Sequence, residues 1–116
     1  MYEFYGKHVL AEFMLISQTL INDIDSLVST TEALINESGA TLVDTKVYKF
    51  RPNGYTLFFV LKESHVSIHS YPEQGAIFLD VFTCGYKINP IVIANGLNNY
   101  LLPQKKMLRV IERHSL

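Results

Sequence analysis

Hydrophobic and polar positions along the chain change their period several times, and these changes predict a mixed order of strands and helices. Apolar residues that alternate or run continuously between turn signals predict strands at residues 8–16, 41–50, 55–61, 65–70, 76–84 and 105–112. Apolar residues at helical spacing predict helices over residues 21–38 and from Asn89-Pro90 to about residue 102. The predicted order is therefore strand, helix, four strands, helix and strand.

This order predicts an α+β fold, a two-layer sandwich in which a mainly antiparallel sheet carries both helices on one face. Residues 55–61 and 76–84, however, are apolar on both alternating faces, which is typical of strands covered on both sides. Two helices cover only one face of a sheet, so we expect the other face to be an apolar patch that associates. The favoured interpretation is a homodimer with four α/β/β/α layers. Cover by irregular loops is the alternative.

Composition narrows the class of protein. The chain has 116 residues, enough for one domain over residues 1–116, and its 48% hydrophobic and 18% charged residues are typical of a folded protein. A net charge of −1 without a basic run argues against nucleic-acid binding. The single cysteine, Cys84, excludes an intrachain disulfide, and neither a signal peptide nor a long apolar run is present. We expect a soluble, cytoplasmic protein with no membrane partner.

One segment, residues 62–85, carries an unusual set of reactive side chains; it reads KESHVSIHSYPEQGAIFLDVFTCG. It places a Glu-Ser pair at a tight connection, a histidine five residues later, a Pro-Glu turn, and a Cys-Gly pair at a strand end. Each feature alone is common, because most serines are ordinary turn residues, most strand histidines are structural, and most buried cysteines are simply small and apolar. The ordered combination is far more specific.

This segment resembles the processing and active-site region of prokaryotic S-adenosylmethionine decarboxylases, which are pyruvoyl-dependent enzymes made as proenzymes. The family pattern is met by Glu63-Ser64-His65, by Ile68-His69-Ser70-Tyr71-Pro72-Glu73 and by Asp80-Val81-Phe82-Thr83-Cys84-Gly85. The similarity extends upstream to residues 6–8, 11–13 and 37–41, and so covers nearly the whole chain. It implies a carboxy-lyase that acts on S-adenosylmethionine and provides the aminopropyl donor for spermidine synthesis.

The resemblance also implies that the chain cuts itself between Glu63 and Ser64, into a beta chain of residues 1–63 and an alpha chain of residues 64–116. Attack of the Ser64 hydroxyl on the Glu63 carbonyl converts the amide to an ester. Loss of the Ser64 α-proton expels Glu63 as a carboxylate, and the remaining dehydroalanine hydrolyses to a pyruvoyl group, the covalent cofactor. No cluster of ligands in the sequence specifies a metal site.

Two further residues match catalytic positions of the family. His69 matches the histidine of maturation, where imidazole accepts a proton. The pyruvoyl ketone forms a Schiff base with the substrate amine and withdraws electrons during decarboxylation. Cys84 matches the proton donor to the product carbon, a role for which a free thiol is mostly protonated at neutral pH. Strand parity predicts His65 and His69 on one face, with Ser64 at the turn.

Substrate contacts follow from the resemblance alone. Phe50 matches an aromatic residue that stacks on adenine, and Glu73 matches a carboxylate that binds the ribose hydroxyls. The sequence departs from the family at Thr56-Leu57, where relatives have a serine that supports processing, followed by glycine. Threonine keeps the hydroxyl, so we expect processing support from Thr56, although β-branching and the missing glycine favour slower maturation.

Two alternatives remain open at this point. The first is a pyruvoyl enzyme of the same fold that decarboxylates ornithine or arginine. Such an enzyme would use the same Ser64, His69 and Cys84, and only Phe50 and Glu73 favour S-adenosylmethionine as the substrate. The second is a non-catalytic dimeric binding module that never cleaves itself, and only the departure from the family pattern at Thr56-Leu57 favours it.

Overall fold

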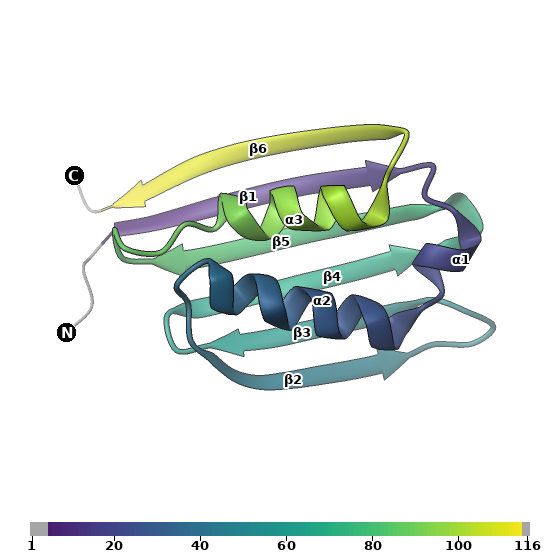
Figure 1. Ribbon diagram of the computed structural model, residues 1–116, viewed down its shortest axis with the longest axis horizontal. Helices are drawn as coiled ribbons and strands as arrows, with labels where there is room; N and C mark the ends of the chain where they lie inside the picture. The colour runs from purple at the N-terminus through teal and green to yellow at the C-terminus, as the bar shows by residue number, and fades with distance from the viewer. Residues whose placement is uncertain (1–4, 115–116) are drawn as a thin grey trace.

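The computed structural model describes residues 5–114, which form one antiparallel sheet of six strands with the long helices on one face (Figure 1). The elements, in chain order, are β1 Tyr5–Met14, α1 Gln18–Ile21, α2 Ile24–Glu37, β2 Leu42–Lys49, β3 Tyr55–Leu61, β4 Ser64–Tyr71, the 3₁₀ helix η1 Pro72–Gln74, β5 Ala76–Cys84, α3 Ile91–Leu101 and β6 Lys105–His114. The strand order in the sheet is β2-β3-β4-β5-β1-β6. The predicted α+β fold is confirmed.

Several predicted boundaries are wrong, and local hydrogen bonds explain the main one. The helix predicted over residues 21–38 is α2, which begins after Asp23, whose carboxylate accepts a hydrogen bond from the Ser26 N–H. The short helix α1 before it was not predicted. The first and last strands are longer than predicted, since β1 and β6 pair with each other from Tyr5–His114 to Met14–Lys105. Ser64, predicted in a turn, is the first residue of β4.

The core lies between the sheet and the helices. On β3 the residues Tyr55, Leu57, Phe59 and Leu61 are buried, whereas the residues between them face the other way. From the helices the core receives Leu27, Ile35, Ile93, Ala94, Leu97 and Leu101. Each fully buried large aliphatic side chain contributes roughly 1.5–3 kcal/mol to the free energy of unfolding. This packing fixes which face of every strand points away from the helices.

The two long helices approach each other closely at Gly96. A Cβ atom at this position would lie 2.2 Å from Cδ2 of Leu34, so a side chain there has no room. The hydrogen atom of glycine therefore lets α2 and α3 lie side by side over the sheet (Figure 1).

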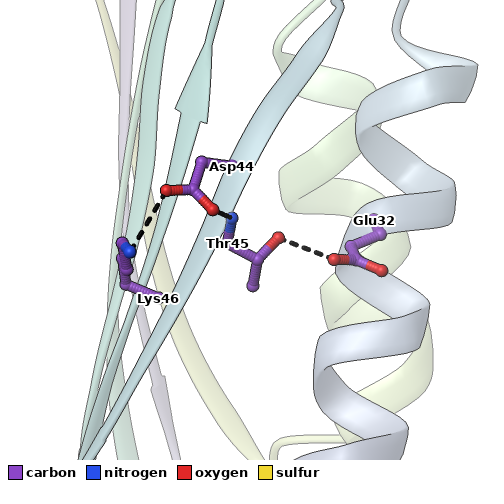
Figure 2. A network of polar contacts seen from close by, with 4 residues as sticks. All are labelled: Glu32, Asp44, Thr45 and Lys46. Atoms are coloured by element: carbon purple, nitrogen blue, oxygen red, sulfur yellow. Dashed lines mark hydrogen bonds and ion pairs between the residues drawn. The ribbon is translucent and has the colours of Figure 1, made fainter.

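The edge strand β2 is joined to α2 by a small polar network (Figure 2). The Thr45 hydroxyl donates to Oε2 of Glu32 at 2.6 Å, and the Asp44 carboxylate accepts from the Thr45 N–H at 2.9 Å and pairs with Lys46 at 3.4 Å. Exposed ion pairs contribute little to the free energy of unfolding. The main link between β2 and α2 in this network is therefore the Thr45–Glu32 hydrogen bond.

The face of the sheet opposite the helices, here called the open face, exposes large apolar side chains, and no element within residues 5–114 covers it. Large apolar side chains that are 37% to 56% exposed lie on it by strand parity: Tyr48, Phe58, Phe78, Met107 and Ile111. The predicted apolar second face is thus present. Within the described residues, no helix is long and apolar enough to cross a membrane.

Candidate active site

The Glu63–Ser64 bond lies at a tight connection between β3 and β4. Only Lys62 and Glu63 separate these strands, and neither is a glycine. The backbone φ of Ser64 is +156°, within the positive range that favours glycine. Residues held in such sparsely populated regions cost about 1–3 kcal/mol each and are concentrated at functional sites. The backbone is therefore strained at the bond where the sequence predicts cleavage.

Cys84 makes two contacts with this junction. Its backbone N–H donates to the Glu63 carbonyl oxygen at 3.1 Å, and its Sγ lies 3.8 Å from Oγ of Ser64. A backbone N–H in this position stabilises negative charge that develops on the carbonyl oxygen during nucleophilic attack. Ser64 and Cys84 are both partly buried, which strengthens such a hydrogen bond. The structure thus brings together Glu63, Ser64 and Cys84.

The side chain of Glu63 is held as well. Its carboxylate accepts hydrogen bonds from the Thr41 N–H at 3.0 Å and from the Thr41 hydroxyl at 3.2 Å. Thr41 precedes β2, so the edge of the sheet anchors the residue whose carbonyl is predicted to be attacked. Sequence reasoning missed Thr41, because its role depends on a contact across 22 residues that no local pattern shows.

His69 and Thr56 form a second pair. Thr56 lies directly opposite His69 in the β3–β4 register, and its Oγ1 lies 3.2 Å from Nδ1 of His69. His69 also borders a cavity of about 250 Å³ whose other polar lining residues are Glu12, Asp80 and Arg109. The threonine hydroxyl predicted to support processing is thus a direct neighbour of the predicted proton acceptor.

The two pairs lie at opposite ends of β4. Ser64 begins the strand and His69 follows five residues later, a separation of about 16 Å in an extended chain. Phe50, directly after β2, and Glu73, within η1, belong to the same end as His69 (Figure 1). We call Glu63, Ser64 and Cys84 the cleavage end, and Phe50, Thr56, His69 and Glu73 the histidine end. Within one chain these groups do not meet.

The histidine end is anchored to the helical layer by Tyr55. The Tyr55 hydroxyl donates to the carbonyl oxygen of Ile21, and Ser70 Oγ accepts from the Tyr55 N–H at 2.9 Å. Burial raises the pKa of the Tyr55 phenol to about 12, since the charged phenolate is poorly solvated there. Tyr55 therefore stays protonated and fixes the start of β3.

A row of rings that sequence reasoning missed crosses the open face beside the cleavage end. His65 stacks on Phe58 with ring centroids 5.5 Å apart, and Phe82 lies 6.2 Å from His65 and 5.6 Å from His8. Gly6 leaves space for this row, because a Cβ atom there would lie 2.6 Å from the Phe82 ring. Strand parity alone could have placed these rings on one face.

Comparisons with known proteins agree with this architecture and with the motif. A family model described as S-adenosylmethionine decarboxylase matches residues 7–114. The chain belongs to the S-adenosylmethionine decarboxylase family. The resemblance inferred from the motif is thereby confirmed.

Individual members of the S-adenosylmethionine decarboxylase family match along nearly their full length. An S-adenosylmethionine decarboxylase proenzyme of Methanococcus aeolicus is 35% identical over 96% of this chain and 95% of its own length. A protein of the same name from Symbiobacterium thermophilum is 34% identical over 98% of this chain and 86% of its own length. The crystal structure of the adenosylmethionine decarboxylase from Aquifex aeolicus superposes with a TM-score of 0.88 at 27% identity, over 98% and 94% of the two chains.

No group of three or more His, Cys, Asp or Glu side chains within residues 5–114 is arranged to hold a metal ion. The chemistry available at the cleavage end is that of a hydroxyl, a thiol, a polarised carbonyl and a strained backbone. This set fits a pyruvoyl group made from serine, because the nucleophile, the scissile carbonyl and a donor to its oxygen are already in contact.

Proposed function

We propose that this chain is a proenzyme that cuts itself between Glu63 and Ser64 and then decarboxylates S-adenosylmethionine. The observation that carries the proposal is the contact set at the cleavage end. The Cys84 N–H already donates to the Glu63 carbonyl oxygen, while Oγ of Ser64 lies beside Sγ of Cys84 on a strained backbone. Family membership supports the same reaction.

Maturation uses only atoms of the chain and one water molecule. Oγ of Ser64 attacks the Glu63 carbonyl carbon, the C–N bond breaks, and the nitrogen of residue 64 takes a proton, which leaves an ester. A base removes the α-proton of residue 64, a Cα=Cβ bond forms, and the Cβ–Oγ bond breaks, so that Oγ leaves in the Glu63 carboxylate. The remaining enamine becomes an imine, and water converts it to the pyruvoyl ketone and ammonia. Strain at Ser64 favours the first step because the attack releases it.

A homodimer completes this site in our proposal. His69 cannot reach Ser64 of its own chain, because the two lie about 16 Å apart along β4. Packing of two open faces about a two-fold axis can place the histidine end of one copy over the cleavage end of the other. The exposed apolar side chains of the open face supply the surface for such a contact. His69 of the partner subunit then accepts the α-proton of residue 64, and Thr56 of the same subunit holds its imidazole.

The mature site combines residues with separate tasks. The pyruvoyl group supplies the electron-withdrawing ketone that makes loss of carbon dioxide feasible. Cys84, whose Sγ borders residue 64, returns a proton to the product carbon. Phe50 is 55% exposed, and Glu73 is also exposed, so both are available to bind adenine and ribose across the dimer contact. The product is the aminopropyl donor for spermidine synthesis.

Mass spectrometry under denaturing conditions tests the cleavage. We expect two pieces, residues 1–63 and a piece of residues 64–116 that begins with pyruvoyl, and borohydride should label the second piece only. Ser64→Ala serves as the control and should remain one chain. A single wild-type chain after long incubation, unreactive toward borohydride, contradicts the proposal and favours a binding module.

Carboxyl-labelled substrates test specificity. S-adenosylmethionine, ornithine and arginine are offered separately to the cleaved enzyme, and release of labelled carbon dioxide is measured. We expect release from S-adenosylmethionine only. Release from ornithine or arginine alone would leave the cleavage proposal intact and overturn the substrate assignment.

A further inference from the structure

Thr83 has a buried hydroxyl with no hydrogen-bond partner among the described residues. The residue is 1% exposed, and its Oγ1 is fully enclosed. An unpaired buried hydroxyl costs free energy, and most native structures avoid it. Valine has nearly the same shape and lacks this cost, so the presence of threonine here calls for a functional reason.

The position of Thr83 points to the cleavage end. Thr83 lies directly opposite Ser64 in the β4–β5 register. The hydrogen bond from the Cys84 N–H to the Glu63 carbonyl joins the two neighbours of Ser64 and Thr83. Ser64 and Thr83 are therefore a non-hydrogen-bonded pair of the antiparallel ladder, the kind in which the two Cα atoms are about 4.5 Å apart. Side chains of such pairs approach each other most closely. The unpaired hydroxyl is therefore the cross-strand neighbour on β5 of the serine that is consumed.

Negative charge develops on two oxygen atoms during maturation. The first is the Glu63 carbonyl oxygen, which already accepts from the Cys84 N–H. The second is Oγ of residue 64 when the Cβ–Oγ bond breaks and Oγ leaves as part of the Glu63 carboxylate. Among residues 5–114 of the uncut chain, Oγ has only the weak contact with Sγ of Cys84, at 3.8 Å. The elimination step therefore lacks a strong donor at the atom that needs one.

We propose that Thr83 supplies this donor: its hydroxyl hydrogen-bonds to Oγ of residue 64 as the ester is eliminated. This inference rests on the proposed function and adds a residue to it. The hydroxyl remains unpaired in the uncut chain because its partner acquires charge only during the reaction, and donors aimed at developing charge are the ones that accelerate a step.

Thr83→Val tests this role, because it removes the hydroxyl and keeps the shape of the side chain. We expect elimination to slow by roughly tenfold to a hundredfold, while the amide-to-ester step continues. Most of the variant should still be uncut in buffer when the wild type has been cleaved, yet neutral hydroxylamine should split it at Glu63, since hydroxylamine cleaves esters and leaves ordinary amide bonds intact. Fragments cut at Asn53-Gly54 or Asn95-Gly96, the Asn-Gly bonds that hydroxylamine can also cleave, are distinguished by their mass. Its thermal midpoint should be equal to or above that of the wild type, because an unpaired buried hydroxyl is lost.

Three controls separate the outcomes. Thr83→Ser keeps the hydroxyl and should restore cleavage, whereas Ser64→Ala should resist hydroxylamine. If Thr83→Val does not fold, Thr83→Ala carries the same test. Cleavage of Thr83→Val at the wild-type rate, or a folded variant that resists hydroxylamine, overturns the role of Thr83 and leaves the proposed function standing. Failure of the wild type itself to cleave overturns the proposed function.

Discussion

The two ends of β4 are built differently. At the cleavage end Glu63, Ser64 and Cys84 are in mutual contact, partly buried, on a backbone that is strained before any substrate binds. At the histidine end the side chains of His69, Phe50 and Glu73 are exposed on the sheet or in the loops that follow β2 and β4. One end is assembled within the chain, and the other is exposed and available to a partner in the proposed dimer.

The proposed dimer gives a physical reason for this difference. A strand of eight residues cannot bring its own two ends together, but two antiparallel copies can exchange them. The open face between the ends is apolar, which favours such a contact.

The largest effect is expected from mixing two inactive chains. Ser64→Ala and His69→Ala, carrying different tags, should each remain largely uncut when expressed alone. When they are co-expressed, a mixed dimer joins an intact Ser64 with an intact His69 of the other subunit. We expect cleavage of the His69→Ala chain to appear, in about half of its copies if subunits pair at random. Gel electrophoresis and mass spectrometry of the tagged chains measure it.

Mixed dimers that are isolated by both tags and still contain only uncut chains would contradict the proposal that the two ends act together across a dimer. The acid-base group would then have to act within its own chain. Full cleavage of His69→Ala alone would show instead that His69 is not needed for maturation.

A charge on the open face should also have a large effect. Phe78→Asp places a carboxylate directly opposite Glu12, on a part of the open face that we expect to be buried in the dimer, so both dimerisation and cleavage should be lost. Val110→Asp is the matched control, because Val110 is 42% exposed against 41% for Phe78 but lies on the helical face by strand parity. Sedimentation and cleavage yield measure both variants. Equal behaviour of the two contradicts dimerisation through the open face.

A smaller effect is expected at the anchor of Glu63. Thr41→Val removes one of the two hydrogen bonds that hold the Glu63 carboxylate, and a loss of about 1 kcal/mol corresponds to cleavage about fivefold slower. Thr45→Val is the control, because it removes a Thr–Glu hydrogen bond of the same kind between β2 and α2 (Figure 2). Cleavage half-times measure the effect. A similar slowing in both variants would assign it to the edge strand and not to Glu63.

The smallest effect concerns how firmly the histidine end is held. Tyr55→Phe removes the hydrogen bond to Ile21 and should lower the free energy of unfolding by about 1 kcal/mol at pH 7. The pKa of Tyr55 is raised from 10.0 to about 12, so the folded chain favours the protonated phenol. This contribution is complete below pH 10 and is lost as the pH rises toward 12.

Denaturant unfolding at pH 7, 10 and 12 measures this dependence. Stability should fall more steeply between pH 10 and 12 in the wild type than in Tyr55→Phe. Parallel curves for the two proteins would show that Tyr55 is not the group that titrates.

Several features of the site could be predicted from local sequence because they depend on neighbours along the chain. Glu63 and Ser64 are adjacent at a turn, Cys84 ends a strand, and the period of two placed His65 and His69 on one face. Thr41 and the exact start of β4 could not be predicted, because both depend on pairing between distant segments. The helix α1 was missed because its four residues are too few to show a helical period of apolar positions.

Periodicity and residue chemistry are properties of the chain, so the sequence alone specifies the order of the strands and the two long helices, the apolar second face and the reactive motif. The tertiary structure alone decided which reactive groups meet. Register placed Thr83 opposite Ser64 and Thr56 opposite His69, and it separated these pairs by most of a strand. Distances across a sheet depend on hydrogen bonding between segments far apart in sequence, and no local pattern encodes them.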